Sequence, residues 1–454
     1  MLPSISELLA HPRVREAVGR IHDSTLAQRA ASFLEELRAN LAQRTEGWDG
    51  PSQTHLVERF VRRLFGQTPG AAAVINATGR VLGDPDLVVP LAEPVLHAWL
   101  ETGTEYAQAS EIGAHRQLEI ARYCRAEAVA AFASYEGAAL ALLSAYATSG
   151  TALVLGGDHG LAAWPRWATL AARAGVALRA VAPQEAIGAS PNPRTPWIVL
   201  RRPRAAASCE GPPDGELVWL RDVAQRAAAC GALLVDAAPS AGLLDPGQFG
   251  WPAVATIPQR LEAGVDLTLT SGDGLLGGPA AGLLAGRLSA LTPIGQHPLT
   301  AALAASPGVW AALGAATALA ARPEQAVHQS PVWQLLAAPE ANLRFRSERL
   351  AAVLGASAEA SRATAVPLES VVLEDVDGPL RGPSWGVALD PARRSAADLA
   401  VWLAGRTPAI KARTAGNQLV LDLRSVFARW DHQLPALFGE ASGVQESTAS
   451  AAEA

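Results

Sequence analysis

The sequence contains almost no lysine. Its 454 residues include 37 lysines and arginines, and Lys411 is the only lysine among them. Lysine supplies the amine for Schiff-base chemistry, whereas the guanidinium of arginine stays protonated. Any reaction that begins at a side-chain amine therefore has one candidate residue in this chain.

Cysteine and net positive charge are also scarce. The three cysteines, Cys124, Cys209 and Cys230, lie far apart and show no CxxC spacing, so the sequence predicts neither a disulfide framework nor a zinc site. The net charge of −6 excludes a global basic field of the kind that attracts nucleic acid. We expect no DNA partner, and any RNA contact would need a local patch of arginine.

Long apolar runs and targeting signals are missing as well. No run of about 18 strongly apolar residues indicates a membrane span. The opening residues 1–7 have neither the basic nor the apolar region of a signal peptide. These features predict a cytoplasmic protein without a membrane partner, and its 49% hydrophobic content is enough for a sizeable core.

The hydrophobic pattern divides the chain into parts. Apolar residues recur at helical spacing over residues 1–66, and from Val74 short apolar runs alternate with alanine-rich helical stretches, which is typical of a mostly parallel α/β sheet. The runs expected to form strands are 152–155, 176–181, 197–200, 232–235, 267–270 and 281–284. The stretches expected to form helices are 117–123, 138–147, 166–174 and 217–229. We predict a helical N-terminal domain (1–68), a large α/β domain (69–315), a small α+β domain (316–438) with strands at 385–389 and 418–423 around a helix near 396–404, and a disordered tail (439–454).

A glycine-rich segment, SGDGLLGGPAAG from Ser271, directly follows one of these apolar runs. Such a loop leaves backbone N–H groups that can cradle an anion. It can equally be a tight connection between strands in which Gly277 and Gly278 supply positive φ. The loop by itself leaves both interpretations open.

Two further polar positions follow the same logic. Asp236 closes a buried strand, where a carboxylate can be a cofactor partner or a helix cap. Ser134 precedes a helix, where it can bind phosphate or serve as a cap. The remaining isolated residues are expected on the surface or in capping positions: His115, Arg116, His159 and His297.

Several segments together resemble one family. They are LPSISELLAHP from Leu2, VINATGRVL from Val74, EAGVDLTLTSGDGLLGGPAAG from Glu262, QHPL from Gln296 and QLVLDLR from Gln418. In this order they resemble bacterial selenocysteine synthase, the L-seryl-tRNA(Sec) selenium transferase family of fold-type I enzymes that use pyridoxal 5′-phosphate (PLP). The resemblance implies a large PLP-type α/β domain, a small C-terminal domain, an N-terminal domain that docks tRNA, and rings of dimers.

The resemblance also implies which residues belong to a cofactor site. Asp236 takes the position beside the pyridine nitrogen, and Ser271, Asp273, Ser134 and Gly278 are the other remnants of the cofactor-binding set. The family's Schiff-base lysine, in the motif SGDK, corresponds to Gly274, which has no amine. We therefore expect no covalent attachment of PLP, and we expect Gly274 in a loop at the edge of a cleft that faces Asp236.

Other family features are changed too. The basic "RG.R" run aligns with residues 110–113, which contain no arginine, and the basic positions after "HPL" have become Thr300 and Ala301. Glu136 would bring a negative charge close to a phosphate dianion. Losing the lysine together with several anion-binding positions indicates a family paralogue that has lost catalysis and is retained for binding or assembly.

Two alternatives stay open at this level. An active PLP-dependent transferase could convert seryl-tRNA(Sec) to selenocysteinyl-tRNA(Sec) with relocated groups, and Lys411 would then have to act from elsewhere. A different anion-binding activity is the other alternative.

The partners follow from the same resemblance. We expect a homodimer or a higher ring, and a hetero-oligomer with an active paralogue stays open. Binding of tRNA is expected to be weak or absent, because only two small arginine patches occur in the near-neutral N-terminal segment. The patches consist of Arg13, Arg15 and Arg20, and of Arg59, Arg62 and Arg63.

Overall fold

The computed structural model describes residues 73–104, 106, 108–146, 150–155, 165–189, 195–200, 214–375 and 378–439, together with 4–12, 14, 26–27, 30–35, 38, 56–57 and 60 in the N-terminal segment. The chain forms two compact units. One unit consists of residues 1–75 and 402–410, and the other of residues 76–401 and 411–454. The boundaries of the four predicted domains stay predictions.

The N-terminal segment is helical where it is described. Helix α1 (Ile5–Ala10) begins at a capping box, in which Ser4 and Glu7 each accept a hydrogen bond from the other's backbone N–H. The apolar residues of this segment are buried together in one cluster: Leu8, Val14, Leu26, Ala30, Phe33, Leu34, Leu56, Val57 and Phe60. All six arginines of the two predicted patches lie outside the described residues.

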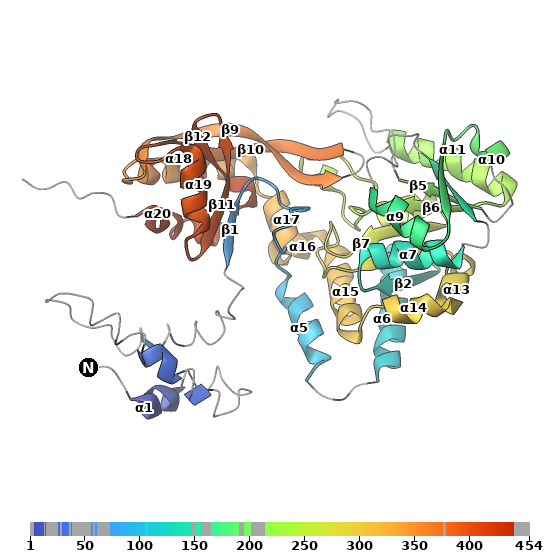
Figure 1. Cartoon of the computed structure of the whole chain (residues 1–454), viewed down its shortest axis with the longest axis horizontal. Helices are drawn as coiled ribbons and strands as arrows, with labels where there is room; N and C mark the ends of the chain where they lie inside the picture. Colours follow the sequence, from blue (N-terminus) through green and yellow to red (C-terminus); the bar gives the residue numbers. More distant parts are fainter. Residues whose placement is uncertain are drawn as a thin grey trace, which may run out of the picture. The chain divides into compact units, whose positions relative to one another are not determined.

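A seven-stranded sheet forms the centre of the larger unit (Figure 1), with the strand order β2-β8-β7-β6-β5-β3-β4. Strand β8 is antiparallel to both of its neighbours, and all other pairs are parallel. The strands are β2 (Ala128–Phe132), β3 (Thr151–Leu155), β4 (Ala177–Val181), β5 (Pro196–Val199), β6 (Leu233–Ala237), β7 (Leu267–Ser271) and β8 (Gly282–Gly286). The mostly parallel α/β sheet predicted from the sequence is confirmed.

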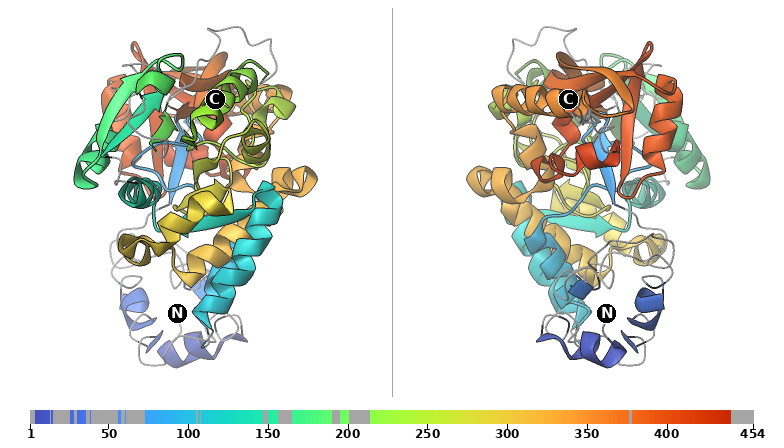
Figure 2. Two further views of the ribbon diagram at one scale, coloured as in Figure 1. Left: turned by 90° about the vertical axis from the view of Figure 1, so that its right-hand side faces the viewer. Right: turned by 90° about the vertical axis from the view of Figure 1, so that its left-hand side faces the viewer.

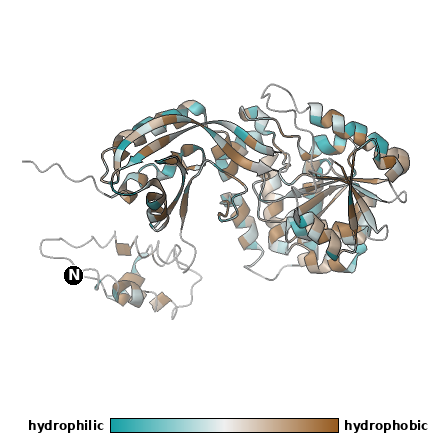
Figure 3. Cartoon of the chain, turned by 45° about the horizontal axis from the view of Figure 1, so that its top comes forward, coloured by the Kyte–Doolittle hydropathy of each residue, from teal (hydrophilic) through white to brown (hydrophobic). Residues whose placement is uncertain are grey.

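Helices cover both faces of this sheet, and the strands between them are the most apolar part of the unit (Figure 3). One face packs against α7 (Tyr135–Ala145), α9 (Pro165–Arg173) and α13 (Leu288–Gln296). The other packs against α6 (Ala109–Cys124), α11 (Asp214–Cys230), α12 (Ile257–Glu262) and α15 (Pro307–Ala320). Helix α15 lies beside α6 (Figure 2) and also packs on α5 (Glu93–Glu101).

A second sheet has five strands in the order β1-β11-β12-β10-β9. They are β1 (Val74–Ala77), β9 (Ala360–Asp375), β10 (Gly378–Pro391), β11 (Ala409–Ala415) and β12 (Gln418–Asp422). The long β9–β10 hairpin packs against α18 (Glu340–Leu354). The predicted strands near 385–389 and 418–423 are confirmed, as is the helix near 396–404, which is α19 (Ala396–Ala404).

The remaining elements are short. They are α10 (Ala186–Ala189), η2 (Pro246–Phe249), α14 (Pro298–Leu303), α16 (Pro323–Gln329), α17 (Pro331–Leu336), η3 (Leu423–Ser425), η4 (Ala428–Trp430) and α20 (Leu434–Leu437). Within the described part of the chain, no helix has both the length and the apolar character needed to cross a membrane.

Candidate functional site

Asp236 and the glycine-rich loop lie at the carboxyl ends of two neighbouring parallel strands, β6 and β7. Asp236 in β6 pairs in register with Thr268 in β7, and β7 leads into the glycine-rich loop at Ser271. The carboxyl ends of parallel strands meet at one edge of a sheet, which is where ligands bind in open α/β folds. Hydrogen bonds join the two ends, since the N–H of Ser271 donates to the Pro239 carbonyl over 3.1 Å.

The glycine-rich loop is closed on itself. The N–H of Gly272 donates to Ala281 and that of Gly278 donates to Gly272, both over 2.8 Å. Gly277 has φ +67°, so its predicted positive φ is confirmed. The same prediction was wrong for Gly278, where a Cβ atom would instead lie 3.1 Å from both Ala316 Cβ and the Gly272 carbonyl oxygen. Close packing, not backbone conformation, requires glycine there.

Gly274 sits tightly against the loop that follows β6. A Cβ atom at Gly274 would lie 2.9 Å from the carbonyl oxygen of Pro239, closer than side-chain carbons approach backbone oxygens. The next residue, Leu275, is fully buried, and its carbonyl accepts a hydrogen bond from the indole of Trp333 over 3.2 Å. This position therefore lacks the room for a side chain as well as the amine.

Replacing Gly274 tests this packing. Gly274→Lys and Gly274→Ala carry the same Cβ atom, so we expect each to lower the free energy of unfolding by a similar amount, about 1–3 kcal/mol. Chemical denaturation measures the loss, and the alanine variant controls for the amine. A lysine variant as stable as the wild type would show that the loop has room for a longer side chain.

Asp236 is fully buried and ion-paired. Its Oδ2 lies 2.6 Å from a terminal nitrogen of Arg260, and the other terminal nitrogen of Arg260 lies 2.8 Å from Oε1 of Glu216. The Nε of Arg260 donates to the carbonyl of Ala255 over 2.9 Å. The sequence-based interpretations of Asp236 were a cofactor partner or a helix cap, and in the structure its carboxylate is paired with the buried Arg260.

Gly274 and Asp236 thus have different neighbours. Gly274 lies against Pro239 and Ser240, and Asp236 lies against Arg260. These contacts do not support the predicted arrangement in which Gly274 faces Asp236. Arg260 went unnoticed in the sequence, because its helix IPQRLE also contains Gln259 and Glu262 and gives no local sign that the arginine is buried.

The predicted phosphate-side residues also have partners within the chain. The hydroxyl of Ser271 donates to Oδ1 of Asp273. Ser134 is the N-cap of α7 and accepts a hydrogen bond from the Gly137 N–H over 2.9 Å, so the capping interpretation is confirmed. Glu136, in the first turn of α7, pairs with Arg166 over 2.6 Å.

The isolated residues are where the sequence placed them, as far as they are described. His297 is the N-cap of α14, His115 is exposed on α6, and Arg116 pairs with Glu119 over 2.6 Å. His159 lies outside the described residues.

Lys411, the single lysine, is in strand β11 of the five-stranded sheet. Its Nζ lies 2.8 Å from Asp84 Oδ1 and 3.1 Å from Asp86 Oδ2. Burial alone would lower the pKa of Lys411, but the hydrogen bonds to Asp84 and Asp86 outweigh it and raise the pKa. The amine is therefore held as an ammonium ion, which is not nucleophilic.

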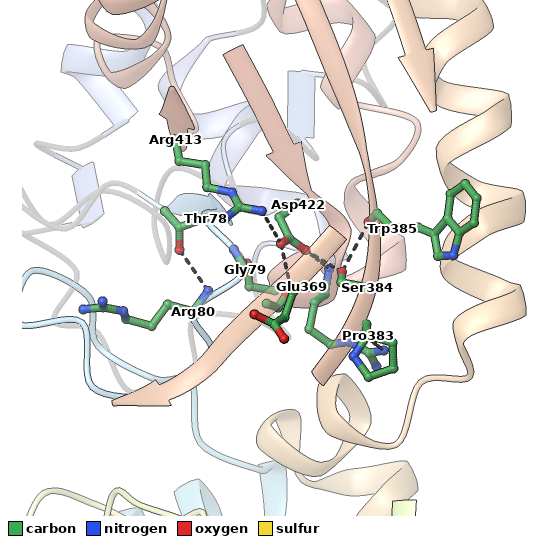
Figure 4. Close-up of polar contacts among 12 residues, drawn as sticks. Thr78, Gly79, Arg80, Glu369, Pro383, Ser384, Trp385, Arg413 and Asp422 are labelled. Atoms are coloured by element: carbon green, nitrogen blue, oxygen red, sulfur yellow. Dashed lines mark hydrogen bonds and ion pairs between the residues drawn. The ribbon is translucent and has the colours of Figure 1, made fainter. Parts of the chain in front are cut away.

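A second buried polar centre lies around Asp422 (Figure 4). Its carboxylate accepts hydrogen bonds from the hydroxyls of Ser370 and Ser384, each over 2.6 Å, and from the N–H of Arg424 over 3.1 Å. A nitrogen of Arg413 lies 3.3 Å away. These contacts connect β9, β10, β11 and η3 to the end of β12, so the carboxylate of Asp422 forms a junction between them.

Arg424 extends this junction to α17, to the segment that follows it and to β10. It donates to the carbonyls of Leu335, Ala338 and Pro383. Burial lowers its pKa to about 10.

Among the residues that the structure describes, no cluster of histidine, cysteine, aspartate and glutamate could hold a metal ion.

The residues present do not fit PLP. The position of the family's lysine is a glycine without space for a side chain, the carboxylate for the ring nitrogen is paired with Arg260, and the Ser271 hydroxyl is bonded to Asp273.

Comparison with known proteins relates the chain to one family. Residues 216–427 match the family model of L-seryl-tRNA selenium transferase. A curated L-seryl-tRNA(Sec) selenium transferase from Moorella thermoacetica is 34% identical over 187 residues, which are 40% of this chain and 39% of that protein. The chain thus spans about two fifths of the length of this relative.

The structural comparison agrees on the fold. D-glucosaminate-6-phosphate ammonia-lyase superposes with a TM-score of 0.55 at 15% identity, over 84% of this chain and 99% of that chain. The predicted fold class, an α/β fold-type I PLP-transferase-like chain with a large mixed sheet and a smaller C-terminal sheet, is confirmed.

Proposed function

We propose that the protein is a selenocysteine synthase-like member of the L-seryl-tRNA(Sec) selenium transferase family that has lost PLP-dependent catalysis and is retained for binding or assembly. The observation that carries this proposal is the lack of an available amine. Gly274 stands at the position of the family's lysine, and Lys411 is an ammonium ion paired with Asp84 and Asp86.

The alternative, an active transferase with relocated groups, depends on Lys411. That residue would have to lose a proton that two carboxylates stabilise, and it would have to leave both of them to reach the loop at Gly274. Because the pKa of Lys411 is raised, raising the pH to free the amine would also break these ion pairs. The contacts of Lys411 therefore favour the first proposal.

A trapping experiment tests the proposal. We expect that incubation of the purified protein with PLP and borohydride gives no stoichiometric reduced adduct, and that seryl-tRNA(Sec) is not converted to selenocysteinyl-tRNA(Sec). Mass mapping locates any adduct, and Lys411→Arg, which keeps the charge but removes the amine, is the control. A stoichiometric adduct in the wild type that disappears in Lys411→Arg would overturn the proposal.

We also propose the cellular setting and partners of this protein. The family relation supports a cytoplasmic homodimer or higher ring, and a mixed ring with an active paralogue is compatible with a role in assembly. The net charge of −6 supports weak or absent binding of tRNA. A monomeric mass by light scattering would contradict the first point, and tight tRNA binding at physiological salt would contradict the second.

A further inference from the structure

We infer that the Asp236 site does not accept PLP even without a covalent link, because an ion-paired triad of Glu216, Arg260 and Asp236 has replaced the cofactor there. This inference deepens the proposed function and rests on it. Loss of the lysine alone would remove the covalent bond and leave a site for the ring and phosphate. The contacts of Asp236 extend the loss to the ring site.

The alternation of side chains along β6 explains how the triad forms. Leu234 packs in the cluster formed by α11 and its neighbours, whereas Val235 and Ala237 pack in the cluster of α7. Side chains two residues apart share a face of a sheet, so Asp236 is on the same face as Leu234. This is the face covered by α11, which carries Glu216, and by α12, which carries Arg260.

All three nitrogens of the Arg260 guanidinium have contacts within the protein. They each have a partner on a different segment: the carboxylate of Asp236, the carboxylate of Glu216 and the carbonyl of Ala255. Arg260 thereby fastens α11, α12 and β6 to one another. Moving it to admit a ligand would break all three contacts.

The side chains of the Asp236 site are buried, which separates them from solvent. The side chain of Asp236 is 0% exposed, that of Arg260 is 2% exposed and that of Glu216 is 13% exposed. The chain's own atoms therefore enclose the carboxylate, and a ring nitrogen could reach it only if some of these atoms moved. A protonated ring nitrogen would in addition be a second cation beside the guanidinium, which raises the free energy of that arrangement.

On the phosphate side, too, the predicted residues have contacts within the chain. The Ser271 hydroxyl already donates to Asp273, and the Ser134 hydroxyl oxygen caps α7. Glu136 stands in the first turn of the same helix, where its charge opposes a phosphate dianion even though it pairs with Arg166. Both ends of the cofactor would meet groups that are already bonded within the chain.

The test uses a probe that separates ring binding from amine chemistry. Deoxypyridoxine phosphate has the ring nitrogen and phosphate of PLP but no aldehyde, so it cannot form a Schiff base with any amine. We expect wild-type protein titrated with this compound in a calorimeter to give no saturable heat, and its Tm to stay unchanged. A ligand that binds only the folded state raises the Tm as its concentration exceeds Kd, so the Tm is a second, independent readout.

Each outcome bears on the inference. The inference is overturned if the wild type binds deoxypyridoxine phosphate saturably and Asp236→Asn abolishes this binding. If Asp236→Asn does not fold, saturable binding by the wild type alone overturns the inference. Binding that Asp236→Asn leaves unchanged lies elsewhere and supports the inference. The proposed function has a separate test, because a borohydride-stable adduct of PLP would contradict it. Reversible binding of deoxypyridoxine phosphate without such an adduct would contradict only the inference about the Asp236 site.

Discussion

Arg260→Met is expected to lower the free energy of unfolding by about 3–5 kcal/mol, the usual cost of removing one partner from a buried ion pair. Methionine is similar to arginine in length and fills most of the space. The substitution leaves the carboxylate of Asp236, which is 0% exposed, without the guanidinium that lies 2.6 Å away. It also removes the donor to the Ala255 carbonyl. Chemical denaturation monitored by circular dichroism measures the loss.

Arg166→Met is the matched control. Arg166 pairs with Glu136 over the same 2.6 Å, but the two side chains are 76% and 38% exposed. Exposed ion pairs contribute about 0–1 kcal/mol, so this variant should be close to the wild type in stability. Equal effects of the two substitutions would show that the triad of Glu216, Arg260 and Asp236 is not a buried electrostatic unit.

A companion variant separates charge from shape. Adding Asp236→Asn to Arg260→Met removes the buried charge that the single substitution leaves unpaired, so the double variant should be more stable than Arg260→Met alone. If the two substitutions instead destabilise additively, Asp236 and Arg260 do not act as a pair.

Much of the fold could be predicted from the sequence because local pattern and tertiary structure agree. Buried parallel strands are continuous apolar runs, and the predicted runs at 197–200 and 267–270 coincide with β5 and β7 to within a residue. The helix near 396–404 was predicted correctly, since it combines helical periodicity with good helix formers.

The missed strands show where local signals fail. Strand β2, AVAAF, is rich in alanine and resembles a helix, and its conformation comes from antiparallel pairing with β8 along its whole length. Strand β9 contains Pro367 and several charged residues, which argue against a strand. It lies at the edge of the five-stranded sheet, where a proline without an N–H is tolerated.

The candidate site was predictable in its residues and unpredictable in its contacts. The glycine at position 274 and the single lysine can be read directly from the sequence. Arg260, the partner of Asp236, lies 24 residues away in sequence on another element, and Lys411 meets Asp84 across 327 residues. Such pairs depend on the packing of complete elements, so no local spacing rule identifies them.

Asp422→Ala is expected to lower the free energy of unfolding by about 3–5 kcal/mol, as Arg260→Met does, because it removes the acceptor at the centre of the Asp422 junction. Three donors would lose their hydrogen bonds to this carboxylate: the hydroxyls of Ser370 and Ser384 and the backbone N–H of Arg424. Each buried group left without a partner costs about 1–3 kcal/mol.

Gly79 provides an internal check on this junction. It has φ +82°, and a Cβ atom there would lie 2.3 Å from Oδ2 of Asp422, so Gly79→Ala should be strongly destabilising in the wild type. In the Asp422→Ala background the overlapping carboxylate is gone. The alanine should then cost mainly the strain of its left-handed backbone, about 1–2 kcal/mol, although its Cβ would still lie 3.0 Å from the Ser370 hydroxyl oxygen. The two substitutions should therefore be less than additive in denaturation experiments. Full additivity would mean that Asp422 does not occupy the space beside Gly79 in the folded protein.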